Sequence, residues 1–273
     1  MPRTRSLSVL AVAIAVCALA AASASAAPTW APASSATIHP GVMTHTDGAQ
    51  CTANFVYTDA NDVYIGQAAH CSGTGTATDT NGCTSGSLPI GTPVTVDGAS
   101  KPGTLAYNSW LTMQAKGETD PDACAYNDLA LVKLDPADVA KVNPSVPFWG
   151  GPTGLDADGT QAGDKVLSYG NSSLRGGVSA LSPKEGTSLG DDGNGWSHTV
   201  YTVTPGIPGD SGSAFLNGTG QALGVLSTVA IAPLAASNGV GDVAKELDYA
   251  NTVGGLAVSL APGTEPFSGP LLP

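Results

Sequence analysis

The sequence predicts an all-β protein made of two antiparallel barrels. Charged residues make up only 12% of the 273-residue chain, which has 35 glycines and 20 prolines, and such a composition suits short strands joined by many turns. Strand-like segments fall into two clusters, and a Pro- and Gly-rich stretch separates them. We therefore expect a first barrel at 37–142, a linker at 143–163 and a second barrel at 164–273.

Each cluster contains five segments rich in β-branched and aromatic residues, with turn residues between them. The first five are 54–58, 63–68, 92–96, 103–108 and 129–134. The second five are 165–169, 177–181, 197–204, 213–216 and 222–228. Asn217-Gly218 is typical of a hairpin turn between the last two. A short helix is expected near the C-terminus, at 244–251.

The first 27 residues have the organisation of a secretory signal peptide. Arg3 and Arg5 precede an apolar run at 7–19, and the small residues Ala24-Ser25-Ala26 follow as a cleavage site. The apolar run is too short for a stable membrane span. Residues 28–36 are rich in Ala, Pro and Ser and predict a disordered leader. We therefore expect a secreted, extracellular protein.

The charge balance disfavours two classes of partner. Without Arg3 and Arg5, 8 basic residues remain against 22 acidic ones, a net charge of −14. Such an acidic chain is poorly suited to nucleic acids and anionic membranes. We expect a freely diffusing monomer with no nucleic-acid partner and no membrane contact after signal removal.

Four cysteines remain after signal removal, an even number that suits disulfide bonds in an oxidising compartment. They allow three connectivities. The segments 51–58 and 63–71 fold back on each other about the turn at 59–62, which brings Cys51 within bridging reach of Cys71. Cys83 and Cys124 then form the second pair. The first bridge would fix the backbone beside His70.

Three separated segments have the residues of a Ser–His–Asp hydrolase, in the chain order His, Asp, Ser. Ser211 lies between two glycines in Gly-Asp-Ser-Gly-Ser at 209–213, which is also typical of an ordinary polar turn. His70 ends an apolar run and precedes a cysteine, whereas Asp128 begins an apolar run. We expect Ser211 to be the nucleophile, His70 the general base and Asp128 the acid that orients His70.

These three segments resemble the chymotrypsin-like (trypsin-fold) serine proteases, in particular the secreted bacterial type. The family pattern is Ala-Ala-His-Cys, then Asn-Asp-hydrophobic-Ala-Leu, then Gly-Asp-Ser-Gly-Gly, and this chain departs from it only at Ser213. The resemblance extends over residues 37–262. It implies two six-stranded barrels with the active site in the cleft between them, where the first barrel supplies His70 and Asp128 and the second supplies Ser211.

The backbone N–H groups of Gly209 and Ser211 are the expected oxyanion hole, because glycine allows the backbone to turn its donor toward the developing negative charge. In animal relatives the aspartate before the serine pairs with an N-terminal ammonium that is released by cleavage after Arg or Lys. Here no Lys or Arg lies between Arg5 and Lys101, so Asp210 needs another cation.

Arg175 is the candidate for that cation, since it is the only arginine left after signal removal and lies in a predicted loop of the second barrel. We expect it to pair with Asp210 and to hold the oxyanion loop in its active form. The alternative is a solvated loop arginine, because surface arginines are usually exposed.

The primary substrate pocket is expected between two short segments of the second barrel. They contain Pro205, Gly206, Ser227, Thr228 and Val229. Trypsin-like members place an aspartate where Pro205 stands, so a preference for Lys or Arg is not expected. Glutamate-specific relatives carry a histidine in the wall at 227–230, which has none here, and an apolar or small side chain is the remaining expectation. The family's pocket disulfide is missing, because Ile207 replaces its cysteine.

No metal or cofactor is expected. The acidic segments 191–195 and 156–159 lack the spacing of a calcium loop and are typical of turns. His39, His45 and His198 do not lie in a catalytic motif, and His198 is interpreted as structural, with a place near the specificity pocket as the lesser alternative.

The function expected from these residues is a secreted serine endopeptidase that cuts protein or peptide substrates through an acyl-enzyme on Ser211. Two alternatives remain open at this point. One is a catalytically silent binding protein on the same fold, because fold alone does not establish function. The other is an esterase that uses the same three residues.

Overall fold

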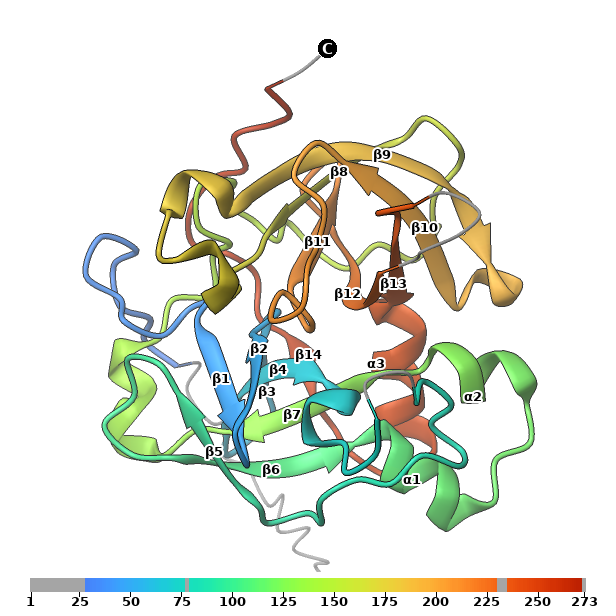
Figure 1. Ribbon diagram of the computed structural model, residues 1–273. Helices are drawn as coiled ribbons and strands as arrows, with labels where there is room; N and C mark the ends of the chain where they lie inside the picture. Colours follow the sequence, from blue (N-terminus) through green and yellow to red (C-terminus); the bar gives the residue numbers. More distant parts are fainter. Residues whose placement is uncertain (1–27, 77–78, 230–234, 272–273) are drawn as a thin grey trace, which may run out of the picture.

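A computed structural model describes residues 28–76, 79–229 and 235–271, so the signal peptide expected at 1–27 lies outside the described residues. The chain forms two β units, the first in the lower half of Figure 1 and the second in the upper half. The mostly β architecture with a short C-terminal helix is confirmed. Among the described residues, no helix is both long enough and apolar enough to cross a membrane.

The first unit is an eight-stranded antiparallel sheet with the order β14-β3-β4-β7-β6-β5-β1-β2. Its strands are β1 (Met43–Thr46), β2 (Ala49–Thr52), β3 (Val56–Thr58), β4 (Val63–Ala68), β5 (Pro93–Val96), β6 (Gly103–Asn108), β7 (Leu129–Lys133) and β14 (Ser259–Leu260). The six-stranded barrel expected here is therefore wrong in strand number. Three strands lie outside the five expected segments: β1 and β2, which form a hairpin around Asp47-Gly48, and the C-terminal strand β14.

The central strands of this sheet are apolar on both faces. On β4, Val63 and Ile65 face the core of the first unit, whereas Tyr64 and Ala68 face a second core. That second core also contains Leu167 and other residues of the second unit. Because side chains alternate along a strand, β4 contributes to both cores, and the two units pack against each other through the second one.

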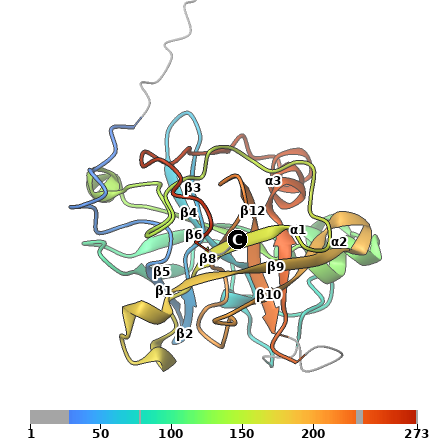
Figure 2. The ribbon, with the colours of Figure 1, turned by 90° about the horizontal axis from the view of Figure 1, so that it is seen from above.

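The second unit is a closed barrel in which β10-β13-β12-β11-β8-β9 follow one another, as expected for a six-stranded barrel. Its strands are β8 (Lys165–Tyr169), β9 (Pro183–Asp192), β10 (Ser197–Thr202), β11 (Ala214–Asn217), β12 (Ala222–Val229) and β13 (Asn238–Asp242). Seen from above, the long strand β9 runs across the width of this unit (Figure 2).

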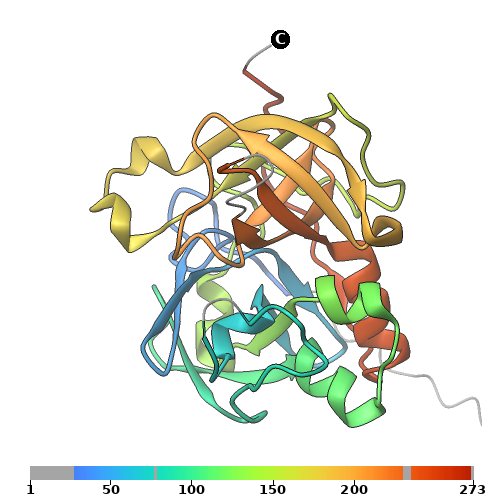
Figure 3. The same cartoon turned by 45° about the vertical axis from the view of Figure 1, so that its right-hand side comes forward.

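Three α-helices lie along one side of the molecule (Figure 3). They are α1 (Ser109–Lys116), α2 (Pro121–Tyr126) and α3 (Val243–Thr252). The helix expected at 244–251 is α3, which contacts β7 of the first unit and β12 and β13 of the second. The first two helices were not expected, although Asn108 and Asp120 cap their N-termini with side-chain hydrogen bonds.

Two expectations about irregular segments are wrong. The strand expected at 177–181 is instead a loop with the 3₁₀ turn η4 (Ser179–Leu181), since Gly176 and Gly177 both have positive φ and interrupt an extended chain. The leader at 28–36 is not disordered. Trp30 packs on the core of the first unit, and the Ala31 N–H donates to the carbonyl of Val142 at 2.8 Å.

The segment expected as a linker, at 143–163, is packed against the second unit. Trp149 is buried, and its indole N–H donates to the carbonyl of Ser168 in β8 at 2.7 Å. After α3 the chain returns to the first unit, where Leu260 of β14 pairs with Tyr57 of β3. The C-terminal part of the chain therefore contributes to both units, since α3 contacts both and β14 joins the sheet of the first.

Candidate active site

A cavity of about 610 Å³ opens where the two units meet. Residues of both units line it, from β2, the turn after β4, the 206–211 loop and β12. They include Gln50, Cys51, His70, Cys71, Asp128, Gly206, Ile207, Pro208, Gly209, Ser211, Leu226, Ser227, Thr228 and Asn238. The structure thus brings together the three residues of the expected triad, both expected oxyanion residues and three of the five expected pocket residues.

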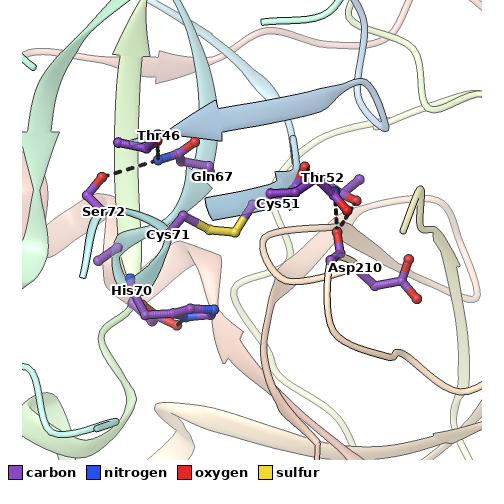
Figure 4. Close-up of a disulfide and its surroundings, with 12 residues drawn as sticks. Thr46, Cys51, Thr52, Gln67, His70, Cys71, Ser72 and Asp210 are labelled. Carbon is purple, nitrogen blue, oxygen red and sulfur yellow. Dashed lines mark hydrogen bonds and ion pairs between the residues drawn. A yellow bond between two sulfur atoms is a disulfide. The ribbon is translucent and has the colours of Figure 1, made fainter. Parts of the chain in front are cut away.

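His70 lies in a short 3₁₀ turn, η1 (Ala69–Ser72), that follows β4 directly. The neighbouring Cys71 is bonded to Cys51 of β2, with the two Cα atoms 6.1 Å apart, and the second expected bridge joins Cys83 to Cys124. Both expected disulfides are confirmed. Figure 4 shows the first bridge between β2 and η1, with His70 beside it. The bridge therefore ties the turn that carries His70 to the neighbouring hairpin.

A second contact fixes the same turn from the other side. The side chain of Asn108 donates to the carbonyl of Ala69 at 3.0 Å, while its Oδ1 accepts from the N–H of Trp110 and caps α1. The sequence reasoning missed this residue, although an Asn just before a helix is a recognised cap.

Asp128 holds His70 through two of its oxygens. Its Oδ2 lies 2.6 Å from Nδ1 of His70, and its Oδ1 accepts the N–H of the same residue at 2.9 Å. Ser227 Oγ donates to Oδ2 at 2.6 Å, and the Asp128 carbonyl accepts from the N–H of Ala69 at 2.7 Å. Such contacts fix the tautomer of His70 with Nε2 free to act as a base.

The ionisation of His70 depends on this neighbour. Burial by itself lowers the pKa of an imidazole, but the charge and the hydrogen bond of Asp128 outweigh it, so the pKa of His70 is raised above its ordinary value of 6.5. The side chain keeps 27% of its area exposed, whereas that of Asp128 keeps 4%. The imidazole of His70 is therefore accessible, whereas the carboxylate of Asp128 is not.

Ser211 follows a tight turn that two glycines make possible. Gly209 and Gly212 have φ values of +94° and +88°. A Cβ at Gly212 would lie 2.5 Å from the carbonyl oxygen of Thr52, so the loop can approach β2 this closely only with glycine. The Thr52 N–H donates to the carbonyl of Ser211 at 2.8 Å and holds the loop there.

The peptide planes beside Ser211 are held by side chains of the neighbouring loops. Ser172 Oγ donates to the Pro208 carbonyl at 2.6 Å, and Thr52 Oγ1 and Gln50 Nε2 donate to the Gly209 carbonyl at 2.8 and 2.9 Å. The N–H groups of Gly209 and Ser211 donate to no acceptor in the described part of the chain. Two fixed donors of this kind are the requirement for an oxyanion hole.

Asp210 is completely buried behind this loop and faces two cations. Arg175 Nη2 lies 2.7 Å from Asp210 Oδ2, so the expected ion pair is present. Lys184 Nζ lies 3.0 Å from the same oxygen and is itself completely buried. The N–H groups of Ser172 and Ile207 also donate to this carboxylate. The sequence reasoning missed Lys184, which no local pattern distinguishes from a surface lysine.

An amide joins the two segments that are expected to form the primary pocket. Asn238 of β13 accepts the N–H of Gly206 at 2.8 Å through Oδ1 and donates to the carbonyl of Thr228 at 3.2 Å through Nδ2. Ile207, Leu226 and Asn238 line the cavity in addition to the expected residues. The hydrogen bonds of Asn238 hold the two walls at a fixed distance.

Pro205 does not line this cavity, contrary to expectation. Its carbonyl points to the cations behind the pocket, where it accepts from Arg175 Nη2 at 2.9 Å and from Lys184 Nζ at 3.4 Å. Those contacts turn the residue away from the pocket. Val229 lies in β12, and its side chain is outside the described residues.

His198 lies away from the cavity and is completely buried. Its Nδ1 lies 2.7 Å from Asp191 Oδ1 and its Nε2 lies 3.1 Å from Asp242 Oδ2. Burial lowers the pKa of His198, but the hydrogen bonds and charges of Asp242 and Asp191 outweigh it and leave the pKa raised. The histidine ties β10 to the N-terminus of α3, which agrees with a structural role.

Among the described residues, one group of three side chains has ligand atoms close enough to share a metal ion: Cys51, His70 and Cys71. Both sulfurs belong to the disulfide bond, so they offer no thiolate to a metal. The acidic turns have internal partners, since Asp191 Oδ1 accepts from Thr160 and Asp156 Oδ1 accepts from the N–H of Asp158.

Fold and site together define the class of architecture: a chymotrypsin-like fold with the His, Asp and Ser motifs gathered at the junction of its two units. The chain is similar to Thermobifida fusca protease A, with a TM-score of 0.54 and 19% sequence identity over 83% of this chain and 99% of that one. It is also similar to a Nocardiopsis protease, with a TM-score of 0.51 and 18% identity over 82% of this chain and 98% of that one.

A third similar structure is a glutamic acid-specific serine protease, described as using a histidine triad in substrate binding. Its TM-score is 0.52 and its identity 18%, over 82% of this chain and all of that one. At these identities the likeness establishes the fold, and the resemblance expected from the three motifs is confirmed at that level.

Comparison by sequence adds little. No protein-family model matches the chain. A glucan 1,3-beta-glucosidase of Candida albicans is 34% identical over 102 residues, and the match covers 34% of this chain and 33% of that protein. The chain therefore spans about a third of the length of that relative.

Proposed function

We propose that the protein is a secreted serine endopeptidase, with Ser211 as nucleophile, His70 as general base and Asp128 as the acid that orients it. The observation that carries the proposal is the fixed pair of His70 and Asp128, which shares one cavity with Ser211 and with two unoccupied backbone donors. A lone Gly-Asp-Ser-Gly turn would have none of these partners.

The reaction proceeds in two halves. Ser211 Oγ attacks the peptide carbonyl while His70 Nε2 takes the hydroxyl proton, and the N–H groups of Gly209 and Ser211 bind the oxygen that becomes negative. His70 then gives its proton to the leaving amine, and the C–N bond breaks. Water enters by the same route, loses a proton to His70 and releases the acid product from Ser211.

The pocket favours an uncharged side chain next to the cut. Between Gly206 and Thr228, the described pocket walls are formed by Ile207, Leu226 and Asn238, and none of these carries a charge. The ionisable residues of the cavity, Asp79, Asp128 and His70, all belong to the first unit, so these second-unit residues offer neither a carboxylate to a lysine or arginine nor a histidine to a glutamate. Burying an unpaired charge is costly, so small or apolar side chains are the expected substrates.

A fluorophosphonate label tests the nucleophile directly. The wild type should be labelled at Ser211, and the Ser211→Ala variant should not be labelled and should lose about 10⁶-fold in turnover, the scale that triad removal has in a serine protease. A folded wild type that stays unlabelled would contradict the enzyme assignment and favour a binding protein.

Parallel assays on casein and on p-nitrophenyl esters separate the peptidase from an esterase. The proposal expects cleavage of casein, and turnover of esters alone would contradict it. Secretion is tested by expressing the full chain in a bacterial host and sequencing the N-terminus of the extracellular product, which should begin at Pro28.

A further inference from the structure

We propose that Glu246 is a positioning residue for the catalytic aspartate, acting as an uncharged carboxylic acid that accepts the main-chain N–H of Asp128. The inference rests on the proposed function and adds a residue to its site. Glu246 Oε1 lies 2.7 Å from the Asp128 nitrogen, and the glutamate is completely buried.

The contact joins parts of the chain that are 118 residues apart. Glu246 lies in the first turn of α3, whose N-terminus is capped by Asp242 through the N–H of Lys245. Asp128 lies directly before β7 in the first unit. The C-terminal helix therefore reaches across the junction of the two units to the residue that orients His70.

Space for this reach is provided by a glycine. A Cβ at Gly241 would lie 2.5 Å from Glu246 Oε1 and 3.1 Å from the Tyr126 carbonyl oxygen. The 2.5 Å contact is too short, so either the new Cβ or the glutamate would have to move. The Tyr126 carbonyl oxygen limits the movement of the Cβ, so the glutamate is the partner that moves. A side chain at position 241 would thus displace the glutamate from Asp128.

With this bond, every polar atom of Asp128 has a partner. The first unit supplies the N–H of Ala69 and two nitrogens of His70, and the second supplies Ser227 Oγ and Glu246 Oε1. Ser227 fixes the carboxylate and Glu246 fixes the backbone from which that carboxylate extends. Loss of the Ser227 contact would free the side chain of Asp128, whereas loss of the Glu246 contact would free its backbone.

The surroundings of Glu246 favour its neutral form. Burial raises the pKa of Glu246 well above its usual range, the bond from the Asp128 N–H opposes this, and the charges of Asp128 and Asp242 add to the rise. Among the described residues, the buried Tyr57 and Tyr107 also interact electrostatically with Glu246, whose charge would raise the pKa of both. Its Oε2 has no hydrogen-bond partner within the described residues, and this costs more free energy for a buried anion than for a neutral acid.

A neutral acid suits this position because it leaves Asp128 as the one anion that faces His70. An ionised Glu246 would add a second negative charge behind Asp128, and this would raise the pKa of His70 further and move the working range to higher pH. As an acid, Glu246 orients Asp128 without changing the charge that His70 senses.

Two substitutions of Glu246 and one of Gly241 test the inference on an enzyme already shown to be labelled at Ser211. Glu246→Gln keeps a neutral acceptor, so kcat should stay within about twofold and the pH profile of kcat/KM should be superimposable on that of the wild type. Glu246→Leu leaves a buried donor unpaired, so kcat should fall by about tenfold or more with KM little changed. Gly241→Ala should have the same effect as Glu246→Leu, from the opposite side of the contact.

Leu247→Ala on the same helix is the matched control, since Leu247 is buried in the second core and has no polar group that could hold Asp128. It should lower thermal stability without lowering kcat. In a Ser211→Ala background, the far-downfield proton of the His70–Asp128 bond should shift in Glu246→Leu and remain in place in Glu246→Gln and Leu247→Ala. This signal reports geometry without turnover.

The outcomes are separable. An active wild type with Glu246→Leu at full kcat would overturn the positioning role and leave the protease assignment intact. A shift of the acid limb to lower pH in Glu246→Gln would overturn the neutral state, because removal of a negative charge lowers the pKa of His70. An inactive wild type would instead contradict the proposed function itself.

Discussion

Lys184 Nζ lies 3.0 Å from Asp210 Oδ2, and the side chains of both residues are completely buried. Arg175 reaches the same oxygen at 2.7 Å from a side chain that is 9% exposed. Burial lowers the pKa of Lys184, and the charge of Asp210 opposes that change. One carboxylate therefore compensates two cations, and all three lie behind the loop that carries Gly209 and Ser211.

The loss of Asp210 should cost more stability than the loss of either cation. Asp210→Asn leaves two buried cations without an anion, and we expect a loss of about 3–5 kcal/mol in the free energy of unfolding. Arg175→Ala and Lys184→Met each leave one ion pair and should cost about 1–3 kcal/mol. Denaturant unfolding in a Ser211→Ala background measures all three. If Lys184→Met lowered the free energy of unfolding as much as Asp210→Asn does, Arg175 would contribute nothing to the pairing with Asp210, and this would contradict the prediction.

The two disulfides should differ in their effect on activity. Their loops of 20 and 41 residues correspond to about 3 and about 4 kcal/mol in the loop-entropy model. Removing Cys51–Cys71 should also lower kcat/KM at temperatures where the protein is still folded, because this bridge holds the turn of His70. Replacing Cys83 and Cys124 by serine should leave kcat/KM unchanged under the same conditions. Equal activity of the two double variants would show that the first bridge acts on stability alone.

The ionisation of His70 should follow its contact with Asp128. Since the pKa of His70 is raised above 6.5, the acid limb of kcat/KM should have its midpoint above that value, and activity should increase as the pH rises through it. An NMR titration of labelled histidine in Ser211→Ala should give the same value. Asp128→Asn removes the charge and should lower it. A midpoint that does not change in Asp128→Asn would contradict the assignment of this pair.

His198 should make folding stability pH-dependent. Its pKa is raised in the folded protein, so its stabilising effect is fully present below the ordinary value of 6.5 and is lost as the pH rises through the folded value. We expect Tm to fall above pH 6.5 and expect this slope to decrease in His198→Gln. A His70→Ala background removes the parallel contribution of the other raised histidine. An unchanged slope in His198→Gln would show that the two aspartates do not hold a protonated ring.

The sequence was most informative where a function depends on neighbouring residues in the chain. The motifs around His70 and Ser211 predicted the fold, and the hairpin turn before His70 predicted the disulfide beside it. Lys184 could not be predicted in the same way, because its role depends on Asp210, a partner 26 positions away on another element. Glu246 and Asn238 escaped detection for the same reason.

At two other places the structure differs from the expectation because neighbouring residues in the sequence favour different local structures. Residues 177–181 are apolar enough for a strand, but Gly176 before them and Gly177 at their start have positive φ, and none of the described strands pairs with them. The leader was expected to be disordered from its composition, yet a single tryptophan at position 30, which is half-buried, packs on the first core and anchors it. One large side chain can outweigh the composition of a short segment.

The pairing of β14 with β3 means that the polypeptide passes between its two units twice, once at 143–163 and again after α3. When only one segment connects two units, one unit can rotate away from the other about that segment. With two, separation of the units would also require the last strand to leave the sheet, so opening and unfolding are coupled. The distance from Ser211 to His70, which belong to different units, is thereby protected from independent movement of either half.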